Sequence, residues 1–189
     1  MRRLFVACTA ALAVSACAGA FAERVSPAEF YPAYTPAQFG SFAAAGPVVE
    51  IHGPRPGGAD DAAIAAALRA PQWFPQAPFS AAPAGEPPEG RQRIILNFGE
   101  AGGMNTISAC RGRVSPGGVV DRLAVAAAYC IGTRPASAAR LVHDAPLTPD
   151  DPAFGDAMAR LFAEMFPNTD PRGRGDNDRN RSRIIPPRP

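Results

Sequence analysis

The stretch RLAVAAAYCI, residues 122–131, decides the fold because large and small side chains alternate along it. Successive side chains of a strand point to opposite faces of its sheet. The pattern therefore predicts a strand with a bulky apolar core on one face and a face small enough for close helix packing on the other. The core set is Leu123, Val125, Ala127, Tyr129 and Ile131, and the small set is Ala124, Ala126, Ala128 and Cys130.

Two further strands and a helix are predicted on the N-terminal side of this stretch. VVEIH (48–52) is a short apolar strand between glycine–proline pairs, and RIILNF (93–98) is a continuous apolar run typical of a central strand buried on both faces. DDAAIAAALRA (60–70) predicts a helix that Asp60 caps and that Pro71 stops. Residues 71–90 hold six prolines and should form an irregular surface segment in which Trp73, Phe74 and Phe79 turn inward.

The stretch DPAFGDAMARLFAEMFP (151–167) predicts the longest helix, with Asp151 as its cap and Pro152 at the first helical position. Its apolar residues recur at the spacing of one wide helical stripe, which predicts a core helix lying on a sheet. The order strand, helix, strand, strand, helix predicts an α/β fold, a two-layer sandwich of a small mixed or antiparallel sheet with two helices on it. The stripe comprises Phe154, Met158, Leu161, Phe162, Met165 and Phe166.

The first residues predict export. Arg2 and Arg3 precede an apolar stretch from Leu4 to Ala16, which is shorter than the roughly 20 residues that a membrane-spanning helix needs. This arrangement is typical of a secretory signal peptide over residues 1–16. Two cleavage sites compete, since Ala20-Phe21-Ala22 would release a soluble periplasmic protein.

The other site, Val14-Ser15-Ala16-Cys17, resembles the lipobox of bacterial lipoproteins with a type II signal peptide. The resemblance implies that the Cys17 thiol is acylated and that Cys17 becomes the first residue of the mature protein, while Cys8 is removed. Because Ala18 stands where aspartate would favour inner-membrane retention, the resemblance implies an outer-membrane anchor facing the periplasm. The stretches LAVAAAYCIGTRPASAARL (123–141) and DPAFGDAMARLFAEMFP (151–167) also resemble the C-terminal half of small, uncharacterised Gram-negative lipoproteins. This resemblance implies no catalytic residues.

The remaining chain is predicted to have three parts. Residues 17–46 should form a lipidated tether, part of which lies as an extended arm on the domain, since prolines oppose a long helix while aromatic residues are dense. Residues 47–167 should form one small α/β domain. Residues 168–189 should be a disordered basic tail, because they hold too few apolar residues to offset the entropy of ordering.

The charge distribution argues against nucleic acid as a partner. All 19 basic residues are arginine, which fits a codon bias as well as it fits phosphate recognition. Residues 17–166 hold 11 arginines and 14 acidic residues, so the predicted domain is slightly acidic. A nucleic-acid-binding domain is expected to carry a basic face.

Cys110 and Cys130 are the cysteines left after export and acylation, and an oxidising compartment predicts a disulfide between them. A regular hairpin about residues 115–118 would instead place Cys110 opposite Leu123, about 23 Å from Cys130, which no disulfide spans. The oxidising compartment favours the disulfide. The hairpin need not prevent it, because residues 111–113 can break the first strand and let Cys110 fold back toward Cys130. The alternative is two buried free thiols.

No metal or cofactor is predicted. His52 and His143 are the two histidines, and neither lies in the HxxxH or CxxC spacing of zinc sites. A hydrolase in which Ser108 or Ser137 works with a histidine is the alternative function, to be judged by whether His52, His143 and Asp144 converge in a pocket with a serine or cysteine.

The leading prediction is a non-enzymatic periplasmic lipoprotein with a structural or protein-interaction role in the cell envelope. Its predicted partners are the membrane, through the lipid anchor, and an envelope protein. A third possibility is that the six arginines of residues 167–189 bind anionic envelope polymers.

Overall fold

The structure is a computed structural model that describes residues 22–82, 91–99, 103–118 and 121–173. The strands form one mixed sheet in the order β1-β7-β6-β5-β3-β4, and β2 also pairs with β7 beyond the end of β1. The pairings β3–β4 and β3–β5 are parallel and the others are antiparallel. The strands are β1 Glu23–Val25, β2 Glu29–Phe30, β3 Val48–His52, β4 Ser80–Ala82, β5 Gln92–Phe98, β6 Leu123–Ile131 and β7 Arg134–His143.

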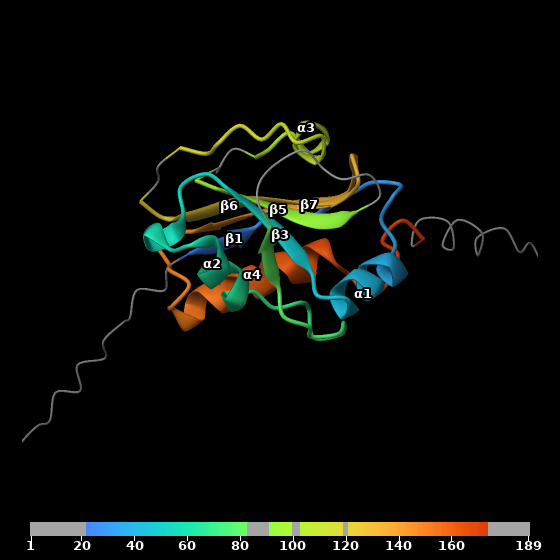
Figure 1. The fold of residues 1–189 in the computed structure, drawn as a ribbon, viewed down its shortest axis with the longest axis horizontal. Helices are drawn as coiled ribbons and strands as arrows, with labels where there is room; N and C mark the ends of the chain where they lie inside the picture. The colour runs from blue at the N-terminus through green and yellow to red at the C-terminus, as the bar shows by residue number, and fades with distance from the viewer. Residues whose placement is uncertain (1–21, 83–90, 100–102, 119–120, 174–189) are drawn as a thin grey trace, which may run out of the picture.

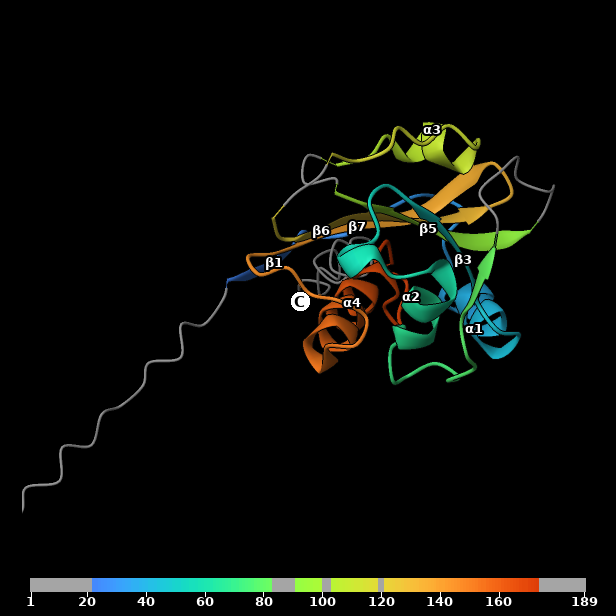
Figure 2. The same ribbon diagram turned by 60° about the vertical axis from the view of Figure 1, so that its left-hand side comes forward.

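Helices lie on both faces of the sheet (Figure 1). Helices α1, α2 and α4 cover one face and the short helix α3 crosses the other, an arrangement that persists after a 60° turn (Figure 2). The α/β fold with a mixed sheet is confirmed, and two helices join the two that were predicted. The helices are α1 Pro36–Ala44, α2 Asp61–Ala67, α3 Thr106–Cys110 and α4 Pro152–Met165.

The side chains of β6 alternate between the two faces of the sheet, as predicted. Its larger residues all belong to the main core, which α4 and α1 cover with aromatic rings. Phe39 of α1 stacks on Phe166 with ring centroids 3.7 Å apart, and Tyr129 meets both rings edge-on. Of the small residues on the other face, Ala128 and Cys130 pack against Ala109 and Cys110 around α3.

Strand β7 was not predicted. It pairs with β6 along its whole length through a tight turn at Gly132, whose φ of 59° suits the left-handed geometry of such hairpins. In its sequence, RPASAARLVH, the larger apolar residues are confined to Leu141 and Val142 near the end, so the stretch shows no alternating pattern typical of a strand. Pro135 lies at its start, beside a register shift at Tyr129 and Cys130, where a missing N–H is tolerated.

The N-terminal segment is part of the folded unit. β1 and β2 pair with β7 as an extended arm, in agreement with the prediction, but residues 36–44 form helix α1, which the prolines were expected to oppose. Pro36 takes the first helical position, where its missing N–H costs nothing, and the Thr35 hydroxyl caps the helix by accepting from the Gln38 N–H at 3.2 Å. The ordered unit therefore begins before the predicted boundary at residue 47.

One predicted local feature is wrong, and a second is confirmed in its position alone. Trp73 was expected to turn inward, yet it is 43% exposed, and its indole N–H donates to the Phe166 carbonyl at 2.9 Å. Asp151 occupies the cap position of α4, but its carboxylate accepts from the backbone and hydroxyl of Thr148 instead of from the helix. Asp60 does cap α2, accepting from the Ala63 N–H at 2.7 Å.

The start of the predicted tail is held on the domain. The Arg172 guanidinium donates to the Tyr34 carbonyl at 2.6 Å and the Tyr31 carbonyl at 3.3 Å, and it pairs with Asp170. The Tyr34 hydroxyl donates to the Pro167 carbonyl at 2.8 Å. Residues 168–173 thus form a turn against the N-terminal arm. The predicted signal peptide, Cys8, Cys17 and residues 174–189 lie outside the described residues.

Candidate functional site

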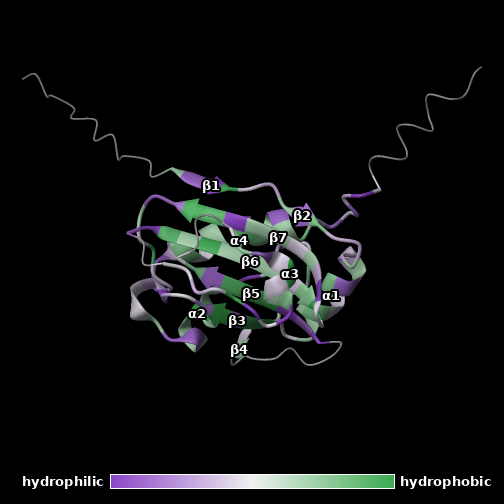
Figure 3. Cartoon of the chain, turned by 90° about the horizontal axis from the view of Figure 1, so that it is seen from above, coloured by the Kyte–Doolittle hydropathy of each residue, from purple (hydrophilic) through white to green (hydrophobic). Residues whose placement is uncertain are grey.

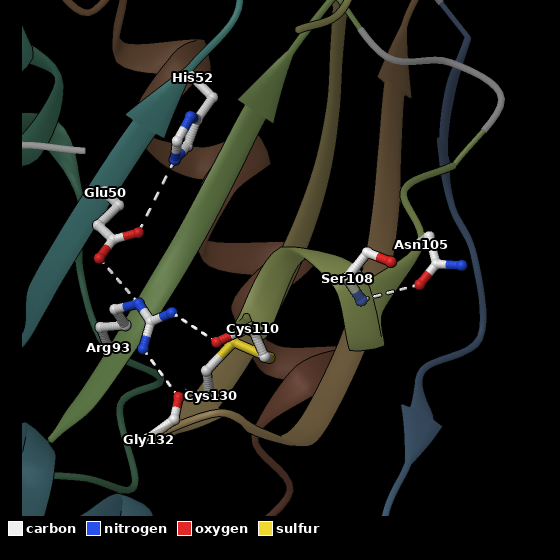
Figure 4. The surroundings of a disulfide bond; sticks show 8 residues. All are labelled: Glu50, His52, Arg93, Asn105, Ser108, Cys110, Cys130 and Gly132. Atoms are coloured by element: carbon white, nitrogen blue, oxygen red, sulfur yellow. Dashed lines mark hydrogen bonds and ion pairs between the residues drawn. A yellow bond between two sulfur atoms is a disulfide. The ribbon is translucent and has the colours of Figure 1, made fainter. Parts of the chain in front are cut away.

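The face that α3 covers holds a buried ion pair. Glu50 of β3 and Arg93 of β5 are 5% and 3% exposed, and Arg93 Nε lies 2.8 Å from Glu50 Oε1 (Figure 4). The main core takes Val49 and Ile51 of β3, so the alternation of side chains turns Glu50 to the opposite face. An ion pair removed from water is tolerated only when further hydrogen bonds satisfy its remaining polar atoms.

Arg93 has those further hydrogen bonds. Its Nη1 donates to the carbonyl of Gly132 and its Nη2 to the carbonyl of Cys110, both at 2.9 Å. One guanidinium therefore connects β3, β5, the β6–β7 turn and the end of α3 (Figure 4). This is a structural use of the side chain, because every nitrogen faces a group of the protein itself.

His52 lies beside the ion pair, on the same face of β3. Its Nε2 is 3.8 Å from Glu50 Oε2, which is too long for a hydrogen bond. The buried Nε2 has no hydrogen-bond partner among the described residues, while the side chain as a whole is 18% exposed. His52 is thus the member of this cluster that reaches toward solvent.

A disulfide joins Cys110 to Cys130 next to Arg93, with Cα atoms 5.5 Å apart and both residues fully buried. The predicted conflict between disulfide and hairpin does not arise, since residues 106–110 are a helix and not a strand. Asn105 starts this helix by accepting from the Ser108 N–H at 2.9 Å. Gly112, at a φ of 79°, then turns the chain away.

Besides Arg93 and the disulfide, Asn97 also attaches the segment around α3 to the sheet, at residues 115–117. Asn97 of β5, 1% exposed, donates from Nδ2 to the Ser115 carbonyl at 2.9 Å and accepts from the Gly117 N–H at 3.3 Å. We refer to residues 103–118 as the α3 cover. The disulfide, Arg93 and Asn97 together attach this cover to the sheet.

A groove of about 440 Å³ lies beside the α3 cover, between residues 103–106 and the N-terminal arm. Alanines 126 and 138 form its floor, and Glu29 and Arg140 lie on its rim. Glu29 accepts a hydrogen bond from the Tyr31 hydroxyl at 3.0 Å. Burial is the main cause that raises the pKa of this hydroxyl.

The two histidines do not come together. His52 lies on β3 and His143 on β7, with β5 and β6 between them. They also belong to opposite faces. His143 is two residues from Leu141 and so points to the main core side, whereas His52 is two residues from Glu50 and points to the α3 side. His143 Nδ1 accepts from the Ala145 N–H at 3.1 Å, and the Asp144 carboxylate is 3.4 Å from Arg24.

The two candidate serines are also separated. Ser137 is fully buried on β7, six residues along the strand from His143, or about 20 Å. Its hydroxyl has no hydrogen-bond partner in the described part of the chain. Ser108 lies on α3, which contacts β6 and β7, whereas His52 lies on β3.

Sequence reasoning missed the Glu50–Arg93 pair, although a signal for it was present. Each residue is the one charge within an apolar stretch, VVEIH and RIILNF. A charge inside a strand that is buried on both faces needs a buried partner. Two such charges of opposite sign in adjacent strands predict that they pair.

Among the described residues, no group of three or more histidine, cysteine or acidic side chains could hold a metal ion. Within the same residues, no helix has the length and apolar character needed to cross a bilayer. Comparison of the chain with protein-family models, with curated proteins and with solved structures finds no match.

Proposed function

We propose that this protein is an exported lipoprotein, acylated on Cys17, anchored in the outer membrane and facing the periplasm. Its domain has a non-enzymatic role in the cell envelope, as a structural or protein-interaction module. The alternative is cleavage after Ala22, which would release a soluble periplasmic protein.

The observation that carries the proposal is the buried Cys110–Cys130 disulfide. Structural disulfides form and persist in oxidising compartments such as the periplasm and are rare in the cytosol. An N-terminus with the features of a signal peptide and a disulfide in the folded domain are independent features that favour the same compartment.

The internal use of its polar side chains favours a non-enzymatic role. Arg93 and Asn97 are buried polar groups on the α3 face, and both attach the α3 cover to the sheet. The groove beside the cover has exposed charges on its rim and alanines on its floor. We propose that an envelope protein contacts this groove.

Acyl labelling in cells tests the anchor. Cys17→Ala should abolish incorporation of labelled palmitate and move the processed protein into the soluble periplasmic fraction. Cys8→Ala is the matched control, since it changes a cysteine of the same apolar stretch and should leave labelling intact. Membrane retention of processed Cys17→Ala protein would contradict the anchor.

The hydrolase alternative has a test of its own. A fluorophosphonate probe labels activated serines whatever their natural substrate, and we expect the native protein to remain unlabelled. Labelling that disappears in Ser108→Ala or Ser137→Ala would establish the alternative and overturn the non-enzymatic role.

A further inference from the structure

The groove beside the α3 cover has two opposite charges on the same face of the sheet. Glu29 of β2 lies directly opposite Ala138 of β7, so both side chains point to the α3 face. Arg140 follows Ala138 by two residues and therefore points to the same face. Figure 3 looks onto this face, with β2 along the edge of the sheet and α3 over β6 and β7. The groove thus has a carboxylate on its arm side and a guanidinium on its β7 side.

The two charged residues occupy diagonal positions of an antiparallel strand pair, which lie roughly 7 to 8 Å apart. Within the described residues, the Glu29 carboxylate bonds to Tyr31 and not to Arg140. A guanidinium has several N–H donors, so it can bind an incoming carboxylate together with a group of its own protein. Because Glu29 and Arg140 are both exposed, a ligand in the groove can reach both charges.

The surrounding residues hold both charged side chains in position. Glu29 Oε2 accepts the Tyr31 hydroxyl at 3.0 Å, and Tyr31 packs against the apolar cluster under α3. The Arg140 side chain runs along Gly103, where an added Cβ would lie 3.2 Å from Arg140 Cδ. Side chains that are already ordered lose less entropy when they bind a partner. The two charges are therefore arranged before a ligand arrives.

Between the charges the groove is lined by small and apolar side chains. Ala126 and Ala138 form its floor, which lets the backbone of a ligand approach the sheet closely, and Met104 lines its side. Ile107 follows the lining residue Thr106 and is 48% exposed. Methionine is enriched in protein interfaces. This lining suits a polypeptide segment that has small or apolar residues beside its charged ones.

We propose that the groove binds an extended segment of the envelope partner that carries a basic and an acidic side chain two residues apart. Alternate side chains of an extended chain point to the same side and lie about 7 Å apart, which matches the diagonal spacing. The basic side chain pairs with Glu29 and the acidic one with Arg140. The inference rests on the proposed protein-interaction role and specifies the chemistry of the partner at this groove.

Peptide binding tests this charge pattern. The protein is the full mature chain with Cys17→Ala, and the probe is the blocked peptide Ser-Val-Lys-Ala-Glu-Val-Ser. Binding is followed through the NMR chemical shifts of the backbone amides. We expect shifts at residues 103–106 and at Ala126 and Ala138, and we expect added salt to weaken the binding.

Charge reversal distinguishes a specific contact from general attraction. Glu29→Lys should weaken binding on the order of 10-fold, because a repulsion replaces an attraction. The same variant should bind Ser-Val-Glu-Ala-Glu-Val-Ser better than the original peptide by a similar factor, which would also show that the variant is folded. Glu164→Lys is the matched control, since it makes the same charge change at an exposed position on α4 and should bind as the parent does.

A peptide with two alanines between the charges, Ser-Val-Lys-Ala-Ala-Glu-Val-Ser, tests the spacing. Its charged side chains point to opposite sides of an extended chain, so it should bind about as weakly as the original peptide binds the Glu29→Lys variant. Four outcomes would overturn the proposal. They are equal losses in the Glu29 and Glu164 variants, equal binding of the two spacings, amide shifts confined to other surfaces, and no detectable binding.

The peptide result can be separated from the tests of the proposed function. The protein in this assay is not acylated and no membrane is present, so a failure here leaves the Cys17 anchor standing. A failure of acyl labelling, or labelling of a serine by the fluorophosphonate probe, would in turn leave the peptide result interpretable.

Discussion

The two faces of the sheet are held by different kinds of interaction. On the face under α4, large rings and aliphatic side chains fill a continuous core that includes Phe39, Phe162 and Phe166. On the face under α3, the buried apolar cluster consists mainly of alanines, Ile95 and the two cysteines. The second face instead has the Glu50–Arg93 ion pair, the disulfide and the Asn97 hydrogen bonds.

The difference follows from how much area each face can remove from water. Burial contributes about 25 cal/mol per Å² of apolar surface, so a face of alanines gains far less than a face of aromatic rings. Non-directional burial is sufficient for α4. The five-residue α3 depends on directional and covalent links, because its own apolar contacts are too small to hold it.

The largest loss of stability is expected from a substitution in the core under α4. Phe162 is fully buried, with its ring centroid 5.6 Å from those of Phe79 and Phe166. Phe162→Ala should lower the free energy of unfolding by about 4 kcal/mol through lost burial and the cavity left behind, measured by chemical denaturation. Glu164→Ala, an exposed change on the same helix, should alter it by less than about 0.5 kcal/mol. Similar losses in both variants would contradict the assigned core.

For the Glu50–Arg93 ion pair, replacing one partner should cost more unfolding free energy than replacing both, because a single replacement leaves an unpaired buried charge. Arg93→Met leaves Glu50 charged and buried, and should cost about 3 to 4 kcal/mol of unfolding free energy. Combining it with Glu50→Leu should reduce the total loss to about 1 to 2 kcal/mol, which reflects the two carbonyls that lose their donor. A double variant that loses as much as the two single variants summed would show that the pair does not couple.

Removing the disulfide should destabilise the α3 face of the sheet more than the α4 face. Cys110→Ala with Cys130→Ala opens a covalent link across a sequence separation of 20, worth about 3 kcal/mol in the chain-entropy estimate. Amide hydrogen exchange should accelerate mainly in the α3 cover while α4 stays protected. Uniform acceleration over both faces would show that they unfold as one unit.

The smallest effect on stability is expected from the exposed Asp170–Arg172 ion pair. Hydrogen bonds from Arg172 lower the pKa of the exposed Asp170 carboxyl below its ordinary value of 3.8. The folded-state pKa is the lower one, so the stabilisation is complete well above pH 3.8 and disappears as the pH falls through the folded-state value. The stability difference between native protein and Asp170→Asn should therefore shrink over that range in acid denaturation. A difference that persists below it would exclude the carboxylate as its source.

The sequence predicted the elements whose patterns are strong. The alternation in β6, the apolar run of β5 and the stripe of α4 each correspond to an element with the expected buried face. It missed β7, because most of that strand is alanine, serine and arginine, which have little strand preference, and Leu141 and Val142 come at its end. That strand forms since β6 offers it a complete set of hydrogen-bonding partners.

The candidate site was less predictable than the fold. The compartment alone favoured the disulfide, whereas local spacing could not show whether residues 106–110 were strand or helix. His52, His143 and the serines were considered for their chemistry, but their separation depends on strand order and on which face each residue takes. Strand order arises from contacts between residues far apart in the chain.

Local sequence patterns by themselves determined the α/β class, the two faces of β6 and the position of the core helix, because alternation and helical spacing are properties of neighbouring residues. The tertiary structure decided the rest. It paired Glu50 with Arg93, brought Cys110 over Cys130, and joined the N-terminal arm and residues 168–173 at one edge of the sheet. Each of these contacts joins distant parts of the chain, and its free energy exists only once the sheet has brought the partners together.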